Sequence, residues 1–255
     1  MSAHVSSVPS VVTDEQVQAF RETGYFLLPG VIPPAHLELL RGACQRAMDE
    51  QDAEMESRGV DRINISIKGS RYFVPDASLS QPALQDFLYS DLTADLCRVL
   101  LGDEAYLFWE QYVVKAADRG GTFSWHQDDA FQAGLDVQPY LSLWCALDDM
   151  TEENGTTYML SYAQAGGGER LPHRKDPVTN DLIGYEGDEP GTAVLVPAGS
   201  IAVFSSRTLH RSGPNRTSAM RRVYLAQFSS EVVRREDGST WGRDEQFLSR
   251  GVRVR

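Results

Sequence analysis

The sequence lacks the long apolar segments that cross a bilayer. No hydrophobic run approaches the ~18 residues that a membrane span needs. The opening residues, MSAHVSSVPSVV, have no basic segment followed by an apolar stretch, as a signal peptide would. We therefore expect no membrane partner and a cytoplasmic protein, with residues 1–12 as a disordered tail.

Cysteine and positive charge are also scarce. The three cysteines are odd in number and widely spaced, and no CxxC pair occurs, which argues against a disulfide framework or a zinc knuckle and favours a reducing compartment. The formal net charge is −12, and nucleic-acid binding requires a basic surface. We therefore expect no nucleic-acid partner. The cysteines are Cys44, Cys97 and Cys145.

The composition that remains is that of a soluble globular protein. Of the 255 residues, 42% are hydrophobic and 24% are charged, enough to bury one large core. We expect a single domain over residues 13–255, as a monomer or homodimer. It divides into a mainly helical part (13–103), a β-sandwich core (104–230) and a C-terminal extension (231–255).

Helical signals are concentrated in the first hundred residues. Thr13 and Gln16 are spaced as a capping box, which predicts the start of a first helix. Apolar residues at helical spacing predict a second helix within 33–59. Leucines recur every four residues in 80–102, which predicts a third helical region that Ser80 would cap.

From residue 105 onward, short β-type runs alternate with turn residues. Several such strands without intervening helices predict an antiparallel sandwich or barrel. The polar stretch 164–191 is long for a loop in a compact domain, which favours a functional or mobile segment such as a lid. The main runs are AYLFWEQYVVK, YLSLWCAL, GTTYML, GTAVLV, SIAVFSS and RRVYLAQF.

Two of the five histidines are candidates for metal ligands, because each lies at the end of a β-type run. His126 precedes Asp128 by two positions, and on one strand both side chains would share a face. With His210 they would form the two-histidine, one-carboxylate set of non-haem Fe(II) oxygenases. An H-x-D pair alone is a weak signal, and His210 alone could be a hydrogen-bonded core histidine. We expect His36 at the surface and His173 in the polar loop; His4 lies in the tail.

Four segments in order carry a family resemblance that covers nearly the whole chain. They are VTDEQVQAFRETGYFLLPGVI, WHQD, LWCALDDMTEENGTTYML and LHRSGPNRTSAMRR. Together they resemble the phytanoyl-CoA dioxygenase-like Fe(II)/2-oxoglutarate oxygenases. The resemblance implies a mainly β fold, with a double-stranded β-helix (jelly-roll, cupin-like) core flanked by N-terminal α-helices.

The resemblance also implies roles for particular residues. His126, Asp128 and His210 match the iron ligands. Arg221 matches the arginine that pairs with the 5-carboxylate of 2-oxoglutarate, a role that suits a guanidinium fork. Ser212 matches a hydroxyl that supports the same carboxylate.

Four further residues have open or lesser roles. Trp144 is either an aromatic neighbour of the co-substrate or a core tryptophan, and Gln111 is a weaker co-substrate candidate. Arg222 should point to the opposite face from Arg221, as a surface residue. Asp129 should face away from the metal and hydrogen-bond a turn or a ligand.

The activity implied by the resemblance uses Fe(II), 2-oxoglutarate and O₂. It is hydroxylation of an unactivated C–H bond of a small molecule, with release of succinate and CO₂. The presence of Asp128 favours hydroxylation over halogenation. Desaturation, cyclisation or epimerisation at the same centre remain alternatives, as does a non-catalytic cupin-like binding protein. The basic segment ERLPHRK (169–175) either attracts an anionic substrate or is a solvated loop.

Overall fold

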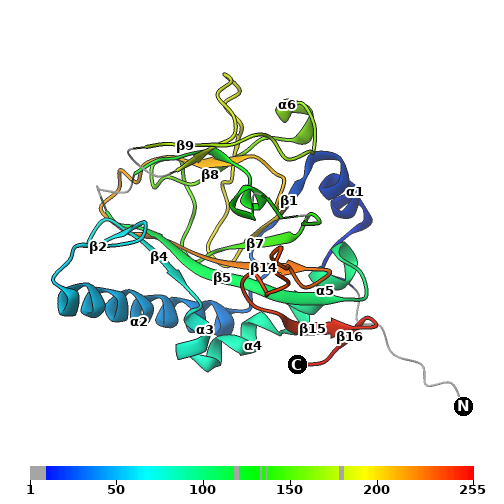
Figure 1. Ribbon diagram of the computed structural model, residues 1–255, viewed down its shortest axis with the longest axis horizontal. Helices are drawn as coiled ribbons and strands as arrows, with labels where there is room; N and C mark the ends of the chain where they lie inside the picture. Colours follow the sequence, from blue (N-terminus) through cyan, green and yellow to red (C-terminus); the bar gives the residue numbers. More distant parts are fainter. Residues whose placement is uncertain (1–9, 118–120, 133, 136, 178–180) are drawn as a thin grey trace, which may run out of the picture.

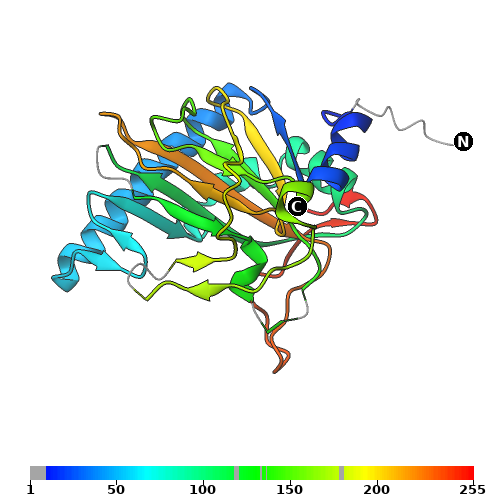
Figure 2. The same cartoon turned by 90° about the horizontal axis from the view of Figure 1, so that it is seen from above.

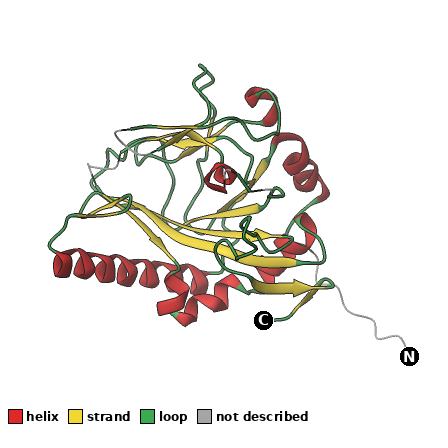
Figure 3. Cartoon of the chain, viewed as in Figure 1, coloured by secondary structure: helices red, strands yellow, loops and turns green. Residues whose placement is uncertain are grey.

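The computed structural model describes residues 10–117, 121–132, 134–135, 137–177 and 181–255. Two antiparallel sheets face each other, and most of the helices cover the outer face of the larger one (Figures 1 and 3). This is the predicted mainly β, jelly-roll arrangement with N-terminal helices, although its helical part is modest. No helix among the described residues is both long enough and apolar enough to cross a membrane.

The larger sheet has ten strands and runs in the order β1-β12-β7-β14-β5-β4-β3-β2, with β15 and β16 attached beside β5. Seen from above, its central strands lie side by side (Figure 2). The strands are β1 (Tyr25–Leu28), β2 (Arg62–Ile63), β3 (Ser66–Ile67), β4 (Arg71–Pro75), β5 (Ala105–Lys115), β7 (Leu141–Ala146), β12 (Ile201–Ser205), β14 (Arg221–Ser229), β15 (Glu245–Ser249) and β16 (Val252–Arg253).

The smaller sheet has four strands in the order β11-β8-β13-β6, and β9 pairs with β10 separately. These strands are β6 (Phe123–His126), β8 (Thr157–Met159), β9 (Arg174–Lys175), β10 (Leu182–Ile183), β11 (Thr192–Ala193) and β13 (His210–Ser212). Its short strands leave most of the segment 164–191 as loop.

Segments outside residues 104–230 also join the larger sheet. β1 and β4, from the first hundred residues, pair with β12 and β5, and β15 pairs with β5 from the C-terminal side. An unpaired sheet edge exposes backbone donors and acceptors, and these additions extend the pairing. The single-domain organisation stays a prediction, but the sheet crosses both of its proposed internal boundaries.

The first two helices follow the sequence signals. In α1 (Asp14–Thr23) the Thr13 hydroxyl accepts from the Gln16 amide and the Gln16 side chain accepts from the Thr13 amide, so the capping box is confirmed. α2 (Pro34–Arg58) is the long second helix. His36, expected at the surface, is instead partly buried, with its ring 5.8 Å from that of Phe87.

The third helical region is not continuous, so the prediction of one helix capped by Ser80 is wrong. It is divided into α3 (Ala77–Ser80), the 3₁₀ turn η1 (Pro82–Leu84), α4 (Gln85–Leu88) and α5 (Asp91–Leu100). Pro82 has no amide hydrogen to continue the α3 ladder. Ser90, rather than Ser80, caps a helix, since its hydroxyl accepts from the Thr93 amide at 3.3 Å.

The N-terminal residues that the structure describes are ordered against α5. Asp95 accepts hydrogen bonds from the Ser10 hydroxyl (2.7 Å) and the Val11 amide (2.8 Å). Val12 is buried. Residues 10–12 thus contact the folded part of the chain, while residues 1–9, with His4, lie outside the described part.

Candidate metal centre

A cavity of about 390 Å³ lies between the two sheets. β5, β7 and β14 of the larger sheet line one side, and β6, β8 and β13 of the smaller sheet line the other. Buried space between two packed sheets is where a small molecule can be shielded from water. All seven of the predicted site residues line this cavity: Gln111, His126, Asp128, Trp144, His210, Ser212 and Arg221.

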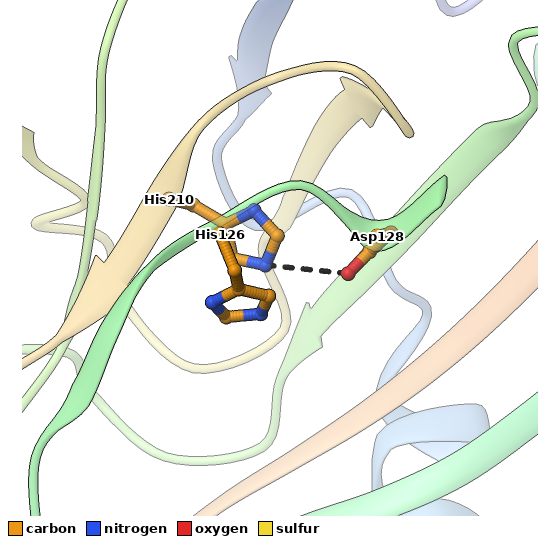
Figure 4. A group of neighbouring side chains, drawn as sticks. All are labelled: His126, Asp128 and His210. Carbon is orange, nitrogen blue, oxygen red and sulfur yellow. Dashed lines mark ion pairs between the residues drawn. The ribbon is translucent and has the colours of Figure 1, made fainter. Parts of the chain in front are cut away.

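His126, Asp128 and His210 form a cluster at the smaller-sheet side of the cavity. One potential ligand atom from each lies within 4.8 Å of the others, and His210 Nε2 is 3.4 Å from Asp128 Oδ1 (Figure 4). The two histidines are cross-strand partners on β6 and β13. Strand pairing thus makes direct neighbours of two histidines that are 84 residues apart in the chain.

Asp128 reaches the cluster by a different route from the one predicted. β6 ends at His126, and Asp128 begins the 3₁₀ helix η2 (Asp128–Gln132). The alternation of a single strand therefore does not place these two side chains together. A tight turn does, held by hydrogen bonds from the Ala130 amide to Gln127 O and from the Asp129 amide to Ser206 O.

Backbone carbonyls fix the orientation of both imidazoles. His126 Nδ1 lies 2.8 Å from Ser124 O, and His210 Nδ1 lies 3.0 Å from Thr208 O. A carbonyl oxygen only accepts, so each Nδ1 donates its hydrogen to the backbone and each Nε2 is the nitrogen available to the cluster. Burial, reinforced by the nearby His210, lowers the pKa of His126 to about 3, which keeps this ring neutral.

Asp128 divides its two oxygens between support and the cluster. Oδ2 accepts from the Ser142 hydroxyl and the Gln227 amide, both at 2.8 Å, while Oδ1 faces His210. Two imidazole nitrogens and one carboxylate oxygen converging on one side suit a ferrous ion that keeps open positions for other ligands. Among the described residues, no other group of histidine, cysteine and acidic side chains has comparable ligand spacing.

Arg221 is a buried cation that forms no ion pair with the described residues. It is 1% exposed, its Nη2 donates to Gly155 O at 2.8 Å, and its Nε has no hydrogen-bond partner. It forms no ion pair with a carboxylate of the described residues, and burial lowers its pKa to about 10. Because a buried, unpaired charge is costly, this position is complementary to the carboxylate of a ligand. The guanidinium also lies 5.8 Å from the Trp144 ring.

Lys115 is a neighbouring cation that the sequence interpretation missed. It is the cross-strand partner of both Arg221 and Arg71, is fully buried, and donates to Gly213 O. Burial, with the nearby charge of Arg221, lowers its pKa to about 6. Counting every second residue along β5 from Gln111 places Lys115 on the same face of the sheet as Gln111 and Val113, a signal that could have identified it, although it does not line the cavity itself.

Gln127, between the two ligand candidates, ties them to the loop 164–191. Its amide side chain donates to Glu169 O (2.9 Å) and Arg207 O (2.7 Å) and accepts from the Leu171 amide (2.7 Å). Its backbone amide donates to His173 Nε2 at 3.0 Å. This part of the loop is therefore an anchor for the ligand-bearing segment.

Asp129, the residue after Asp128, also holds the ligand-bearing segment to its neighbours. Its buried carboxylate pairs with Arg170 Nε (3.1 Å) and Arg207 Nε (3.4 Å) and takes no part in the metal-ligand cluster. Arg174 pairs with the exposed Glu186. Arg170, His173 and Arg174 are thus engaged elsewhere, and no basic residue of 169–175 lines the cavity, which gives no support to a role in attracting an anionic substrate.

Arg222 is not the simple surface residue that was expected. It points away from the cavity, as the alternation requires, but it is partly buried and makes a bidentate pair with Asp148. The two contacts, Nε to Oδ2 and Nη2 to Oδ1, measure 3.0 and 2.6 Å. Neighbouring arginines on one strand therefore serve opposite faces of the sheet.

Comparison with known proteins agrees with this geometry. The family model described as phytanoyl-CoA dioxygenase (PhyH) matches residues 20–223. Phytanoyl-CoA dioxygenase domain-containing protein 1 of Danio rerio is 24% identical, over 84% of this chain and 89% of that protein. The L-proline trans-4-hydroxylase of Streptomyces griseoviridis is 29% identical, over 86% of each chain.

Solved structures show the same fold. EctD from S. alaskensis, determined with 2-oxoglutarate and 5-hydroxyectoine, superposes with a TM-score of 0.72, covering 96% of this chain and 89% of that one at 17% identity. The family match spans most of the chain and includes the cluster, the buried arginine, all of β6 and β13, and the start of β14. This chain belongs to the phytanoyl-CoA dioxygenase (PhyH) family.

Proposed function

We propose that this dioxygenase uses Fe(II), 2-oxoglutarate and O₂ to hydroxylate an unactivated C–H bond of a small molecule, releasing succinate and CO₂. The observation that carries the proposal is the pairing of a three-donor cluster with a buried, anion-free arginine in one cavity. A metal and a dicarboxylate would satisfy both at once. The proline hydroxylase relative and the 2-oxoglutarate complex of EctD support the same reading.

The roles of the residues follow from their contacts. His126 and His210 would bind the metal through Nε2, and Asp128 through Oδ1. Arg221 would pair with the 5-carboxylate of 2-oxoglutarate, and the buried Ser212 hydroxyl would donate to the same group. When bound, the ferrous ion with its co-substrate and O₂ supplies the oxidising power for C–H cleavage.

The other predicted residues shape the co-substrate end of the cavity. Trp144 lines it and packs near the Arg221 guanidinium, so it would lie beside the co-substrate chain. Gln111 projects from β5 into the same cavity and could donate to the co-substrate. Asp128 occupies the position that a halide would need, which favours hydroxylation over halogenation.

The test is anaerobic reconstitution of the protein with Fe(II) and 2-oxoglutarate, followed by exposure to O₂. We expect saturable binding of 2-oxoglutarate that requires the metal, and then succinate in amounts that rise with enzyme concentration. Protein that neither binds nor decarboxylates 2-oxoglutarate would contradict the proposal.

Gln127→Ala is expected to weaken metal binding about 10- to 100-fold, as loss of a residue that orients ligands commonly does. The substitution removes three side-chain hydrogen bonds of the His126–Asp128 segment, two to the loop 164–191 and one to Arg207 O. Metal affinity would be measured by anaerobic Fe(II) titration. Glu169→Ala is the control, because Gln127 contacts only the backbone oxygen of Glu169; equal affinities in both variants would argue against this role.

Gly155→Ala is expected to destabilise the protein by about 2–4 kcal/mol, from left-handed backbone strain plus a steric clash. Gly155 has φ +75°, and an added Cβ would lie 2.4 Å from Gly213 O. Gly238→Ala is a matched control, since φ is +80° there and nothing lies within 4 Å of the added atom. Thermal unfolding should show a larger loss of stability for Gly155→Ala. Equal losses in the two variants would mean that Gly155 is not tightly packed against Gly213 and Pro214.

A further inference from the structure

Three large aromatic side chains that line the cavity remain partly open to solvent. Phe131 is 56% exposed, and Trp109 and Trp241 are partly buried. All three border the same cavity as the metal-ligand cluster. Exposed aromatic surface gathered at one opening, rather than scattered singly, marks a place where a ligand covers it.

These rings come from distant parts of the chain and line the same cavity. The centroids of Trp109 and Trp241 are 5.5 Å apart, with an angle of 34° between the planes, so a flat molecule can stack beside them. Phe131 projects from η2, and its ring centroid is 6.0 Å from that of His126. A molecule held by the three rings would therefore lie next to the cluster.

Other residues of the cavity lining are also aromatic. Phe73 and Phe123 contact each other edge to face at 5.2 Å, and both line the cavity. Tyr140 donates its hydroxyl to Gln132 Oε1 at 3.1 Å, so these two polar groups satisfy each other in part. The aromatic rings of this part of the lining offer apolar surface to a substrate.

Apart from Arg221, the described lining has one arginine or lysine, Arg211, and its guanidinium lies over aromatic rings. Arg221 is assigned to the co-substrate. Arg211 lies 4.3 Å from the Tyr158 ring centroid and donates to Pro190 O. Asp181 also lines the cavity, but it is acidic and would repel a carboxylate.

Two further cations lie behind an aromatic ring. Arg71 and Lys115 contact the ring of Phe123, at 5.3 and 5.0 Å from its centroid, and neither is among the described residues that line the cavity. Phe123 thus separates their charge from the space in which a substrate would sit. A free amino acid would find no partner for its carboxylate there.

We propose that the substrate is a predominantly apolar molecule with a ring or flat hydrocarbon face, which stacks on Trp109 and Trp241, contacts Phe131, and carries no free carboxylate near the oxidised carbon. This inference rests on the proposed function and names its substrate class. It separates this chain from its relative that is named for hydroxylating L-proline.

The test is direct binding to the full chain loaded with Mn²⁺ and 2-oxoglutarate in the absence of O₂, measured by isothermal titration. The probes are 2-naphthol and L-proline. We expect saturable, one-to-one binding of 2-naphthol and no saturable binding of L-proline. The titration needs no turnover, so a failure of 2-oxoglutarate binding would be seen separately and would count against the proposed function.

Variants locate the bound probe. Phe131→Ala and Trp241→Ala should each weaken 2-naphthol binding about tenfold, a change equivalent to ~1.4 kcal/mol. Trp241→Phe keeps an aromatic face and should retain most of the affinity. Its retained binding would show that the loss in Trp241→Ala comes from the missing ring and not from misfolding. Leu195→Ala is the control, since Leu195 is 57% exposed and lies outside the cavity lining.

Three outcomes would overturn the proposal. They are no saturable binding of 2-naphthol, tighter binding of L-proline than of 2-naphthol, and 2-naphthol binding that neither Phe131→Ala nor Trp241→Ala weakens. The last would place the probe on another surface of the protein.

Discussion

Asp128→Ala is expected to abolish metal-dependent decarboxylation of 2-oxoglutarate. It removes the only carboxylate of the cluster and leaves the Ser142 hydroxyl and the Gln227 amide without their buried acceptor. Loss of a residue that merely orients a ligand costs 10- to 100-fold in metal affinity, so we expect loss of the ligand itself to cost more than about 100-fold. His126→Ala should have the same effect. Fe(II) titration and succinate formation measure both.

The adjacent acid provides the control. Asp129 is even more deeply buried, but it pairs with Arg170 and Arg207 and does not face the cluster. Asp129→Asn should lower thermal stability, because two partly buried guanidinium groups lose a charged partner, and should retain metal binding. If Asp128→Ala bound Fe(II) as tightly as the unaltered protein, the metal site would have to lie elsewhere.

Arg221→Ala is expected to weaken 2-oxoglutarate binding by roughly 2–4 kcal/mol, which corresponds to roughly 30- to 1,000-fold in Kd. The guanidinium is buried and pairs with no carboxylate of the described residues, so a bound carboxylate would be its main anionic partner. Titration of the metal-loaded protein with 2-oxoglutarate measures the change. Arg221→Lys should be intermediate, because one ammonium cannot reproduce a bidentate fork.

Arg222→Ala is the matched control on the same strand. It breaks the pair with Asp148 on the opposite face of the sheet, so it should reduce stability and leave the affinity for 2-oxoglutarate unchanged. Equal losses of co-substrate affinity in the two variants would refute the role assigned to Arg221.

The sequence determined those features whose signals are local. The capping box of α1 needs only Thr13 and Gln16. The run AYLFWEQYVVK coincides with β5, because alternating, β-branched and aromatic residues carry their own preference for a strand. The order of four motifs also sufficed to predict the jelly-roll fold and the family, and to nominate seven residues that all line one cavity.

Local signals failed where contacts distant in the chain compete with them. The leucine spacing of 80–102 predicts one helix, but Pro82 and the Ser90 cap divide it and its pieces pack separately on the sheet. Asp128 meets the histidines through a 3₁₀ turn, whereas period-2 counting placed it on a strand.

Only the tertiary structure decided how the cavity is completed. Cross-strand register places Lys115 beside Arg221, and Gln127 binds a loop more than 40 residues further along the chain. Trp241 joins the mouth of the cavity from the C-terminal segment, where its ring meets that of Trp109. Such pairings depend on packing and sheet register between remote segments, which no short stretch of sequence specifies.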